Sequence, residues 1–139
     1  HQGAAVVIPV LDNGALLFER QYRYPLRQVF YEFPAGKIDP GEEAFATAKR
    51  ELLEETGYTA GKIEKLTMIA TTVGFSNEKI YLYAAQDLSA GEQCPDEDEF
   101  INTVKVPLAE AVRMVEEGKI YDAKSVTSIL LLKERLERS

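Results

Sequence analysis

Short apolar runs separated by turn residues dominate the first quarter of the chain and predict β-strands. Residues 3–10 form a β-branched apolar run, and residues 15–18 form a second run. The turn sequence Asp12-Asn13-Gly14 lies between them, so the pattern predicts a β-hairpin. A third apolar segment over residues 29–34 predicts another strand, and the glycines and proline of residues 36–41 predict a loop after it.

The spacing of apolar residues then changes to that of a helix. Between Glu42 and Thr56, apolar side chains recur every three or four positions, and Gly57 follows where a helix C-cap belongs. Two further helices are predicted, over residues 107–117 and 123–136. The first is opened by Pro107 and followed by Gly118.

The remaining apolar runs predict strands over residues 65–73, 79–85 and 100–106, with loops between them. No repeat, low-complexity stretch or linker interrupts this order. The sequence therefore predicts one α/β (α+β) domain over residues 1–139.

The composition supports one folded core. The 139 residues are 45% hydrophobic and 28% charged, and a chain of this length buries roughly two thirds of its unfolded surface without a disulfide or a structural metal. Cys94 is the only cysteine, which excludes an internal disulfide and a multi-cysteine zinc site and suits a cytoplasmic protein.

The charge and the apolar runs limit the expected partners. The chain has no apolar run of about 18 residues and no signal-peptide pattern, so neither a membrane span nor secretion is expected. The net charge of −7 argues against nucleic acid or an anionic membrane as the partner, because both attract basic surfaces.

Three glutamates crowd one side of the first predicted helix. Glu54 and Glu55 lie three and four positions after Glu51, and each like-charged pair at such a spacing costs on the order of 0.2–0.5 kcal/mol. Carboxylate oxygens are the ligands of hard divalent cations such as Mg²⁺, which would offset this cost. A solvated acidic face paired with Arg50 is the alternative that the glutamates alone leave open.

Residues 36–58 match every fixed position of the Nudix box, G-x5-E-x7-R-E-U-x-E-E-x-G-U, in which U is a bulky apolar residue. The chain therefore resembles the Nudix hydrolase superfamily. The resemblance implies an α/β/α sandwich with a mixed β-sheet and the Nudix loop-helix-loop. The matching residues are Gly36, Glu42, Arg50, Glu51, Leu52, Glu54, Glu55, Gly57 and Tyr58.

The sequence outside the box resembles one branch of this superfamily, the ADP-ribose pyrophosphatases and nucleoside diphosphate sugar hydrolases. That branch usually has proline where this chain has Val73, which leaves a broader range of nucleotide sugars open. The similar segments are Gln21-Tyr22-Arg23, Glu32-Phe33-Pro34-Ala35-Gly36, Gly74-Phe75-Ser76-Asn77-Glu78, Asp96-Glu97-Asp98-Glu99-Phe100 and Gly118-Lys119-Ile120-Tyr121-Asp122-Ala123.

The resemblance implies a cation site on the helix. Glu51 and Glu55 would hold Mg²⁺, for which Mn²⁺ is a possible substitute. Glu54 would add a third contribution, as a cation ligand or in catalysis, and the carbonyl oxygen of Ala35 would complete the ligand set. Arg50 would serve catalysis by orienting a box glutamate through a charge-assisted hydrogen bond.

A catalytic base would come from the late acidic loop. Within the run from Asp96 to Glu99, the resemblance favours Glu97 as the residue that deprotonates the attacking water. Glu99 is the second choice and an additional candidate cation ligand. A plain solvated loop is the alternative for this run.

The nucleotide sugar itself would meet residues outside the box. Arg20, Arg23 and Arg27 supply cationic donors for phosphate groups. Glu32 and Glu78 are candidate acceptors for sugar hydroxyls. Tyr22, Tyr24 and Phe30 are candidates for stacking on the base, and the alternative is that they only pack or lie on an edge strand. Phe75 is a further candidate substrate residue, and it resembles an aromatic residue of the hydrolases that act on nucleoside triphosphates or dinucleoside polyphosphates.

The predicted function is Mg²⁺-dependent hydrolysis of the pyrophosphate linkage in a nucleoside diphosphate sugar, such as ADP-ribose or GDP-mannose. One alternative is hydrolysis of nucleoside triphosphates or dinucleoside polyphosphates with the same box. Another is a non-catalytic sensor of nucleotide sugars. It is disfavoured because the box carboxylates are intact and no residues remain for a DNA-binding helix-turn-helix. The branch also implies a homodimer in which N-terminal segments complete the partner's site.

Overall fold

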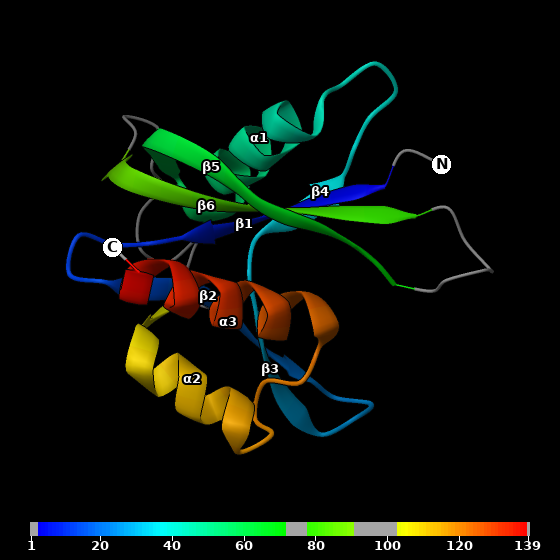
Figure 1. The fold of residues 1–139 in the computed structure, drawn as a ribbon. Coiled ribbons are helices and arrows are strands. Elements are labelled where there is room, and N and C mark those ends of the chain that lie inside the picture. The colour runs from blue at the N-terminus through cyan, green and yellow to red at the C-terminus, as the bar shows by residue number, and fades with distance from the viewer. Residues whose placement is uncertain (1–2, 72–77, 91–102, 139) are drawn as a thin grey trace.

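A mixed α+β fold is formed by the residues that the computed structural model describes, which are 3–71, 78–90 and 103–138. It confirms the predicted fold class, with two β-sheets and three helices (Figure 1). None of these helices has the length and apolar content needed to span a lipid bilayer. The elements are β1 (Ala4–Pro9), β2 (Ala15–Arg23), β3 (Gln28–Glu32), β4 (Ala35–Lys37), α1 (Ala44–Thr56), β5 (Tyr58–Ala70), β6 (Lys79–Ala90), β7 (Thr103–Pro107), α2 (Leu108–Glu116) and α3 (Ala123–Arg138).

The strands form one four-stranded and one three-stranded sheet. The first has the order β4-β1-β6-β5, with β1 and β6 parallel and the other pairs antiparallel, so it is a mixed sheet. The second has the order β3-β2-β7 and is antiparallel. Figure 1 shows α1 on one face of the four-stranded sheet and α3 on the other, with α2 beside α3.

Alternate residues of β1 pack into two apolar cores on opposite faces of the four-stranded sheet. Ala5 and Val7 face the core under α1. Val6 and Ile8 face the larger core, which also contains Ile129 of α3. These four residues of β1 are each at most 1% exposed, which is typical of a strand covered on both faces.

The predicted hairpin of residues 3–18 is wrong. The turn forms, since the N–H of Leu11 donates to the carbonyl oxygen of Ala15 at 2.8 Å. However, β1 and β2 lie in different sheets, and the ladder between them is limited to a bridge from Val10 to Leu16. A strand buried on both faces needs neighbours within its own sheet, and β1 takes β4 and β6 instead.

Strand lengths also differ from the expectation. β5 begins directly after the helix at Tyr58 rather than at residue 65, and β6 continues to Ala90 rather than to residue 85. Most of the added positions of β5 are exposed or half-buried, so they carry little apolar alternation, and antiparallel pairing with β6 holds them in place. Residues 36 and 37, predicted to begin a loop, form with Ala35 the short edge strand β4 against β1.

Candidate active site

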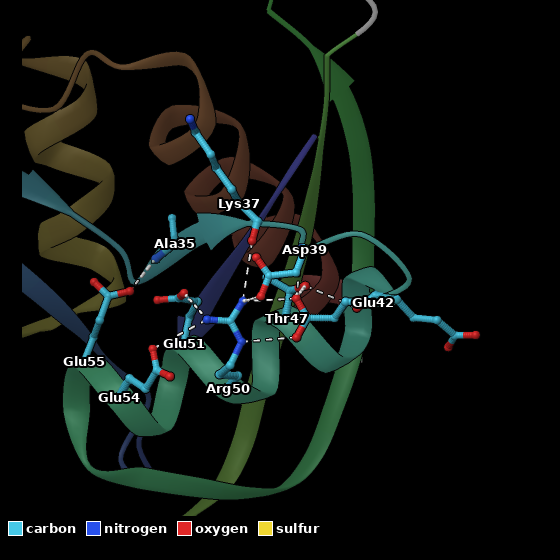
Figure 2. A network of polar contacts seen from close by, with 10 residues as sticks. Ala35, Lys37, Asp39, Glu42, Thr47, Arg50, Glu51, Glu54 and Glu55 are labelled. Carbon is cyan, nitrogen blue, oxygen red and sulfur yellow. Dashed lines mark hydrogen bonds and ion pairs between the residues drawn. The ribbon is translucent and has the colours of Figure 1, made fainter. Parts of the chain in front are cut away.

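Helix α1 places its apolar and its acidic residues on different sides. Ala48 and Leu52 are fully buried and pack in the core of the four-stranded sheet. The side chains of Glu51 and Glu55 extend toward β4, while that of Glu54 is 57% exposed (Figure 2). The helix ends as predicted at Gly57, whose φ of 78° lets its N–H donate to the carbonyl oxygen of Leu53.

Arg50 is the centre of a polar network (Figure 2). Its guanidinium binds the Glu42 carboxylate in a two-pronged contact, with Nε 3.1 Å from Oε2 and Nη2 3.0 Å from Oε1. Its Nη1 donates to Oε1 of Glu51 at 2.8 Å. Glu54 and Asp39 lie within 3.5 and 3.6 Å of the same guanidinium. Arg50 therefore contacts Glu42, which precedes it in the box, and both Glu51 and Glu54, which follow it.

Glu42 connects this network to the loop before the helix. Its Oε1 accepts hydrogen bonds from the hydroxyl of Thr47 at 2.6 Å and from the N–H of Asp39 at 3.2 Å. The hydrogen bond from Arg50, then that from Thr47, lowers the pKa of Glu42 to about 2. Glu42 therefore stays ionised and ties the loop to the first turns of α1.

Gly36 makes room for Glu51. A Cβ atom built at Gly36 would lie 2.1 Å from Oε1 and 2.4 Å from Cδ of Glu51, which no real contact permits. The loop predicted over residues 36–41 does not begin at Gly36, because this residue lies in β4 opposite Ala5. Gly41 does have a positive φ of 79° and fits the turn role. The absence of a side chain at Gly36 lets the Glu51 carboxylate lie against the strand.

Glu51 and Glu55 form a pair with unusual protonation. Burial, and then the hydrogen bond to Glu55, raises the pKa of Glu51 to about 7. Burial, and then contact with Glu19, raises the pKa of Glu55 to about 7. The N–H of Ala35 donates to Oε2 of Glu55 at 3.1 Å. This contact brings β4 beside the glutamates, while the role predicted for the Ala35 carbonyl oxygen stays a prediction.

Glu19 is a residue of this cluster that the sequence did not indicate. It follows four buried residues of β2 and is itself half-buried, and its contact with Glu55 raises the pKa of that carboxyl group. Burial raises its pKa as well. An acidic residue directly after a buried apolar run was the available signal, but only the tertiary fold shows that it faces α1.

The donor chemistry of this cluster fits a divalent cation. Glu19, Glu51 and Glu55 supply carboxylate oxygens, the ligand type that Mg²⁺ and Mn²⁺ accept. In the described ranges no three acidic, histidine or cysteine side chains already surround a common metal position. Oε1 of Glu51 and Oε2 of Glu55 are also engaged, by Arg50 and by Ala35. Cation binding therefore requires these carboxyl groups to lose protons and reorient.

Two of the predicted substrate residues meet on the three-stranded sheet. Nη2 of Arg23 lies 3.1 Å from Oε1 of Glu32, and the Arg23 guanidinium lies 5.8 Å from the ring centre of Phe30. Glu32 is the cross-strand neighbour of Glu19. The pair formed by Arg23 and Glu32 is therefore connected to the carboxylate cluster through Glu19.

The other predicted substrate residues are more dispersed. Arg20 is exposed and, because strand residues alternate, its side chain leaves β2 on the face opposite Glu19. Arg27 is exposed in the turn between β2 and β3, with a positive φ of 51°. Glu78 lies directly before β6. Three predicted residues lie outside the described residues, namely Phe75, Glu97 and Glu99.

Comparisons with known proteins agree with this architecture. A family model described as NUDIX domain matches residues 1–128. ADP-ribose pyrophosphatase from Bacillus subtilis (strain 168) is 44% identical over 141 residues, which cover 99% of this chain and 76% of that protein. Methanol dehydrogenase activator from Bacillus methanolicus is 42% identical over 141 residues, with the same coverage.

A solved structure is also similar. The crystal structure of an ADP compounds hydrolase superposes with a TM-score of 0.82 and 30% sequence identity, covering 97% of this chain and 72% of that one. Similarity at this level spans both sheets and all three helices. The family match over most of the chain and these relatives confirm the resemblance found in residues 36–58: the chain belongs to the Nudix family.

Proposed function

We propose that this chain is a pyrophosphohydrolase that cleaves nucleoside diphosphate sugars into a nucleoside monophosphate and a sugar phosphate. The observation that carries the proposal is the pair of carboxylates on α1, Glu51 and Glu55, placed against β4 within a Nudix fold. The relatives named ADP-ribose pyrophosphatase and ADP compounds hydrolase support this substrate class.

The residues of α1 and β4 would hold the divalent cation, Mg²⁺ or in its place Mn²⁺. Glu51 and Glu55 would bind it, with Glu54 and the carbonyl oxygen of Ala35 as further ligands. When bound, the cation neutralises charge on the phosphate oxygens and lowers the pKa of a water molecule. Arg50 would keep the Glu51 carboxylate in place through its 2.8 Å hydrogen bond. Its side chain thus acts on catalysis through Glu51.

Water would attack phosphorus after losing a proton to a carboxylate base. We keep Glu97 as the first candidate for this base and Glu99 as the second, or as a further cation ligand. On the substrate side, Arg23 would bind phosphate and Phe30 would stack on the base. Glu32 would accept hydrogen bonds from sugar hydroxyls, and the remaining candidates are Arg20, Arg27, Glu78 and Phe75.

The exposed turn between β2 and β3 supports a homodimer. Tyr24 and Leu26 are 81% and 59% exposed, and Tyr22 is 50% exposed. Apolar and aromatic side chains gathered on one projecting turn are typical of surfaces that bind another protein. We propose that this segment contacts a second copy of the chain, and that the protein is cytoplasmic. Light scattering at micromolar concentration is expected to give twice the mass of one chain, and a monomer would contradict the dimer.

A substrate panel tests the proposed reaction. Purified protein with saturating Mg²⁺ is expected to release a nucleoside monophosphate from ADP-ribose, GDP-mannose or another nucleotide sugar. Inorganic phosphate or pyrophosphate released from nucleoside triphosphates alone, or cleavage of dinucleoside polyphosphates alone, would instead support the related hydrolase activities. No turnover of any compound would contradict the proposal.

The variant Glu55→Gln separates an enzyme from a sensor. The enzyme is expected to lose turnover by about a hundredfold or more, because a cation ligand is removed from the reacting phosphate. The far-ultraviolet circular dichroism should be unchanged. Glu134→Gln on α3 removes one exposed carboxylate away from the site and is the matched control. A sensor would bind nucleotide sugars without turnover in either form.

A further inference from the structure

Tyr121 joins the segment between α2 and α3 to strand β3 by two side-chain contacts. Its hydroxyl donates to Oε1 of Gln28 at 2.7 Å, and its ring centre lies 5.9 Å from that of Phe30 at an angle of 52° between the rings. The ring nevertheless stays at the surface, because Tyr121 is 58% exposed. An aromatic ring that is held in place and left open is suited to stack on a planar ligand.

The chain on either side of Tyr121 is fixed. Ile120 is buried in the larger core, and its N–H donates to the carbonyl oxygen of Met114 at 3.1 Å. On the other side, Asp122 caps α3, since its Oδ1 accepts a hydrogen bond from the N–H of Ser125 at 2.9 Å. The Tyr121 ring is therefore positioned before any ligand binds, so little conformational freedom would be lost on binding.

Tyr121 lies against a row of side chains on β3. Residues two positions apart in a strand share a face, so Glu32, Phe30 and Gln28 lie along one face of β3 over about 13 Å. Arg23 contacts the same row, with its guanidinium 5.8 Å from the Phe30 ring centre and its Nη2 3.1 Å from Oε1 of Glu32. The row thus offers an ion pair at one end and aromatic rings toward the other.

The two ends of this row suit an elongated substrate. β3 ends at Glu32, and three residues later the N–H of Ala35 donates to Glu55 of the proposed cation site at 3.1 Å. A nucleoside diphosphate sugar whose pyrophosphate binds at that site would have one end placed to follow β3. At the far end of the row, Phe30 is half-buried, whereas Tyr121 presents the more exposed ring.

We propose that Tyr121 binds the base of the nucleotide sugar, with its ring stacked on the base beside Phe30 and its orientation fixed by Gln28. The inference rests on the proposed function in one respect, that the ligand is a nucleoside diphosphate sugar. It assigns recognition of the base to the segment between α2 and α3, outside the Nudix helix. The alternative is a ring that only covers the edge strand β3, and it predicts no preference for ligands that contain a base.

The two products of ADP-ribose hydrolysis separate the base from the phosphate. AMP contains the base and ribose 5-phosphate lacks it, and calorimetry with Mg²⁺ measures the dissociation constant of each without turnover. Tyr121→Leu keeps apolar bulk but removes the ring, so it is expected to weaken AMP binding by about fivefold or more and ribose 5-phosphate binding by less than about twofold. Tyr121→Phe keeps the ring and should retain most of the affinity for AMP.

Leu130→Ala on α3 is the matched control, since it truncates a 44% exposed apolar side chain that lies outside the row. It should bind both ligands as the unsubstituted chain does. Thermal unfolding without ligand checks that each variant is folded. If Tyr121→Leu does not fold, Tyr121→Gln, which also lacks the ring, takes its place.

The outcomes separate this inference from the proposed function. AMP affinity of Tyr121→Leu within about twofold of the unsubstituted chain would overturn the role of Tyr121 and leave the proposed function standing. Equal losses for AMP and ribose 5-phosphate would also overturn it, because they would show that the ring supports the site as a whole. GMP and mannose 1-phosphate form the corresponding pair of probes if GDP-mannose is the substrate. A chain that neither binds a nucleoside monophosphate nor hydrolyses any nucleotide sugar would contradict both proposals.

Discussion

At the scale of single residues, the position of the Glu51 carboxylate depends on the absence of a side chain at Gly36. β4 and α1 approach so closely that the Glu51 carboxylate occupies the position of a Cβ atom at residue 36. Arg50 fixes the other side of the same carboxylate. The position of Glu51 is therefore set from two directions, by a backbone and by a guanidinium.

The substitution Gly36→Ala is expected to move Glu51 and to weaken cation binding. A methyl group 2.1 Å from Oε1 forces the carboxylate away from β4 and strains its hydrogen bond to Arg50. We expect a lower affinity for Mg²⁺ by about tenfold or more, measured by calorimetry, with a lower kcat.

Gly14→Ala provides the matched control for an added methyl group. Gly14 lies in the turn before β2 with a φ of 85°, and a Cβ atom there meets no other atom within 4 Å. Its cost is backbone strain of about 1 kcal/mol, without contact to the site. Equal losses of Mg²⁺ affinity in both variants would show that Gly36 has no specific relation to Glu51.

At the scale of elements, one face of α1 contributes to the stability of the fold and another face carries the glutamates of the proposed active site. The buried side holds the helix on the four-stranded sheet through Ala48 and Leu52. The other side carries the glutamates that contact β4 and β2. A change on the buried face is therefore expected to reduce stability before it alters the reaction.

Leu52→Ala and Leu53→Ala test this division on neighbouring residues. Leu52 is fully buried, so its truncation leaves a cavity and is expected to lower the free energy of unfolding by about 2–5 kcal/mol. Leu53 is 41% exposed, and its truncation should cost about 1 kcal/mol or less. Urea denaturation measures both. Similar losses for the two variants would contradict the assigned faces.

Helices were predictable because their signals are local. α1 begins at Ala44 rather than Glu42, since residues 42 and 43 lie before the first turn, but its end at Gly57 was correct. The pairing of the strands was harder to predict, because the parallel pair of β1 and β6 joins segments far apart in the chain. Local turn residues therefore suggested a hairpin that the tertiary structure does not contain.

The same limit separates Glu51 and Glu55 from Glu19. The spacing of the box placed the first two on one helix side, and the structure brings them together as that spacing predicts. Glu19 has no motif around it, and its contact with Glu55 joins two elements, β2 and α1, that are far apart in the chain. Residues grouped by helical periodicity are visible in sequence, whereas residues grouped by packing are not.

At the scale of the whole molecule, the net charge of −7 is unevenly distributed. Residues 32–58 contain seven acidic and three basic side chains, and residues 92–99 contain five acidic and no basic ones. The first of these segments forms β4 and α1, where Glu51 and Glu55 are held close together. The acidic excess of residues 32–58 thus lies in the segment that carries the proposed cation site.

Stability without cations is therefore expected to fall as the pH rises. Glu51 and Glu55 have a pKa of about 7 in the folded chain, against 4.5 for an ordinary glutamate. A group with a raised pKa favours folding while it is protonated, so its contribution is present at low pH and is lost as the pH passes through about 7. In EDTA, Tm should decrease between about pH 5 and pH 8, by about 5 °C or more.

Added Mg²⁺ should remove most of this decrease in Tm, because the cation neutralises the carboxylates after they have lost their protons. Glu55→Gln should show a shallower decrease in EDTA, since one titrating group is absent. Glu134→Gln should retain the full slope. A Tm that rises from pH 5 to pH 8 in EDTA would contradict the protonation assigned to this pair.

The central position of β1 has a consequence for how the chain folds during synthesis. Ala4 pairs with Ile80 and Pro9 with Ala85, so the first described strand has no parallel neighbour until β6 has left the ribosome. β5 also needs β6 as its antiparallel partner. A nascent chain ending at residue 71 would lack β6 and α3, so Val6 and Ile8 of β1 would miss part of the core that covers them, including Ile129. The fold is therefore expected to assemble late and cooperatively, with non-local pairing as the slow step.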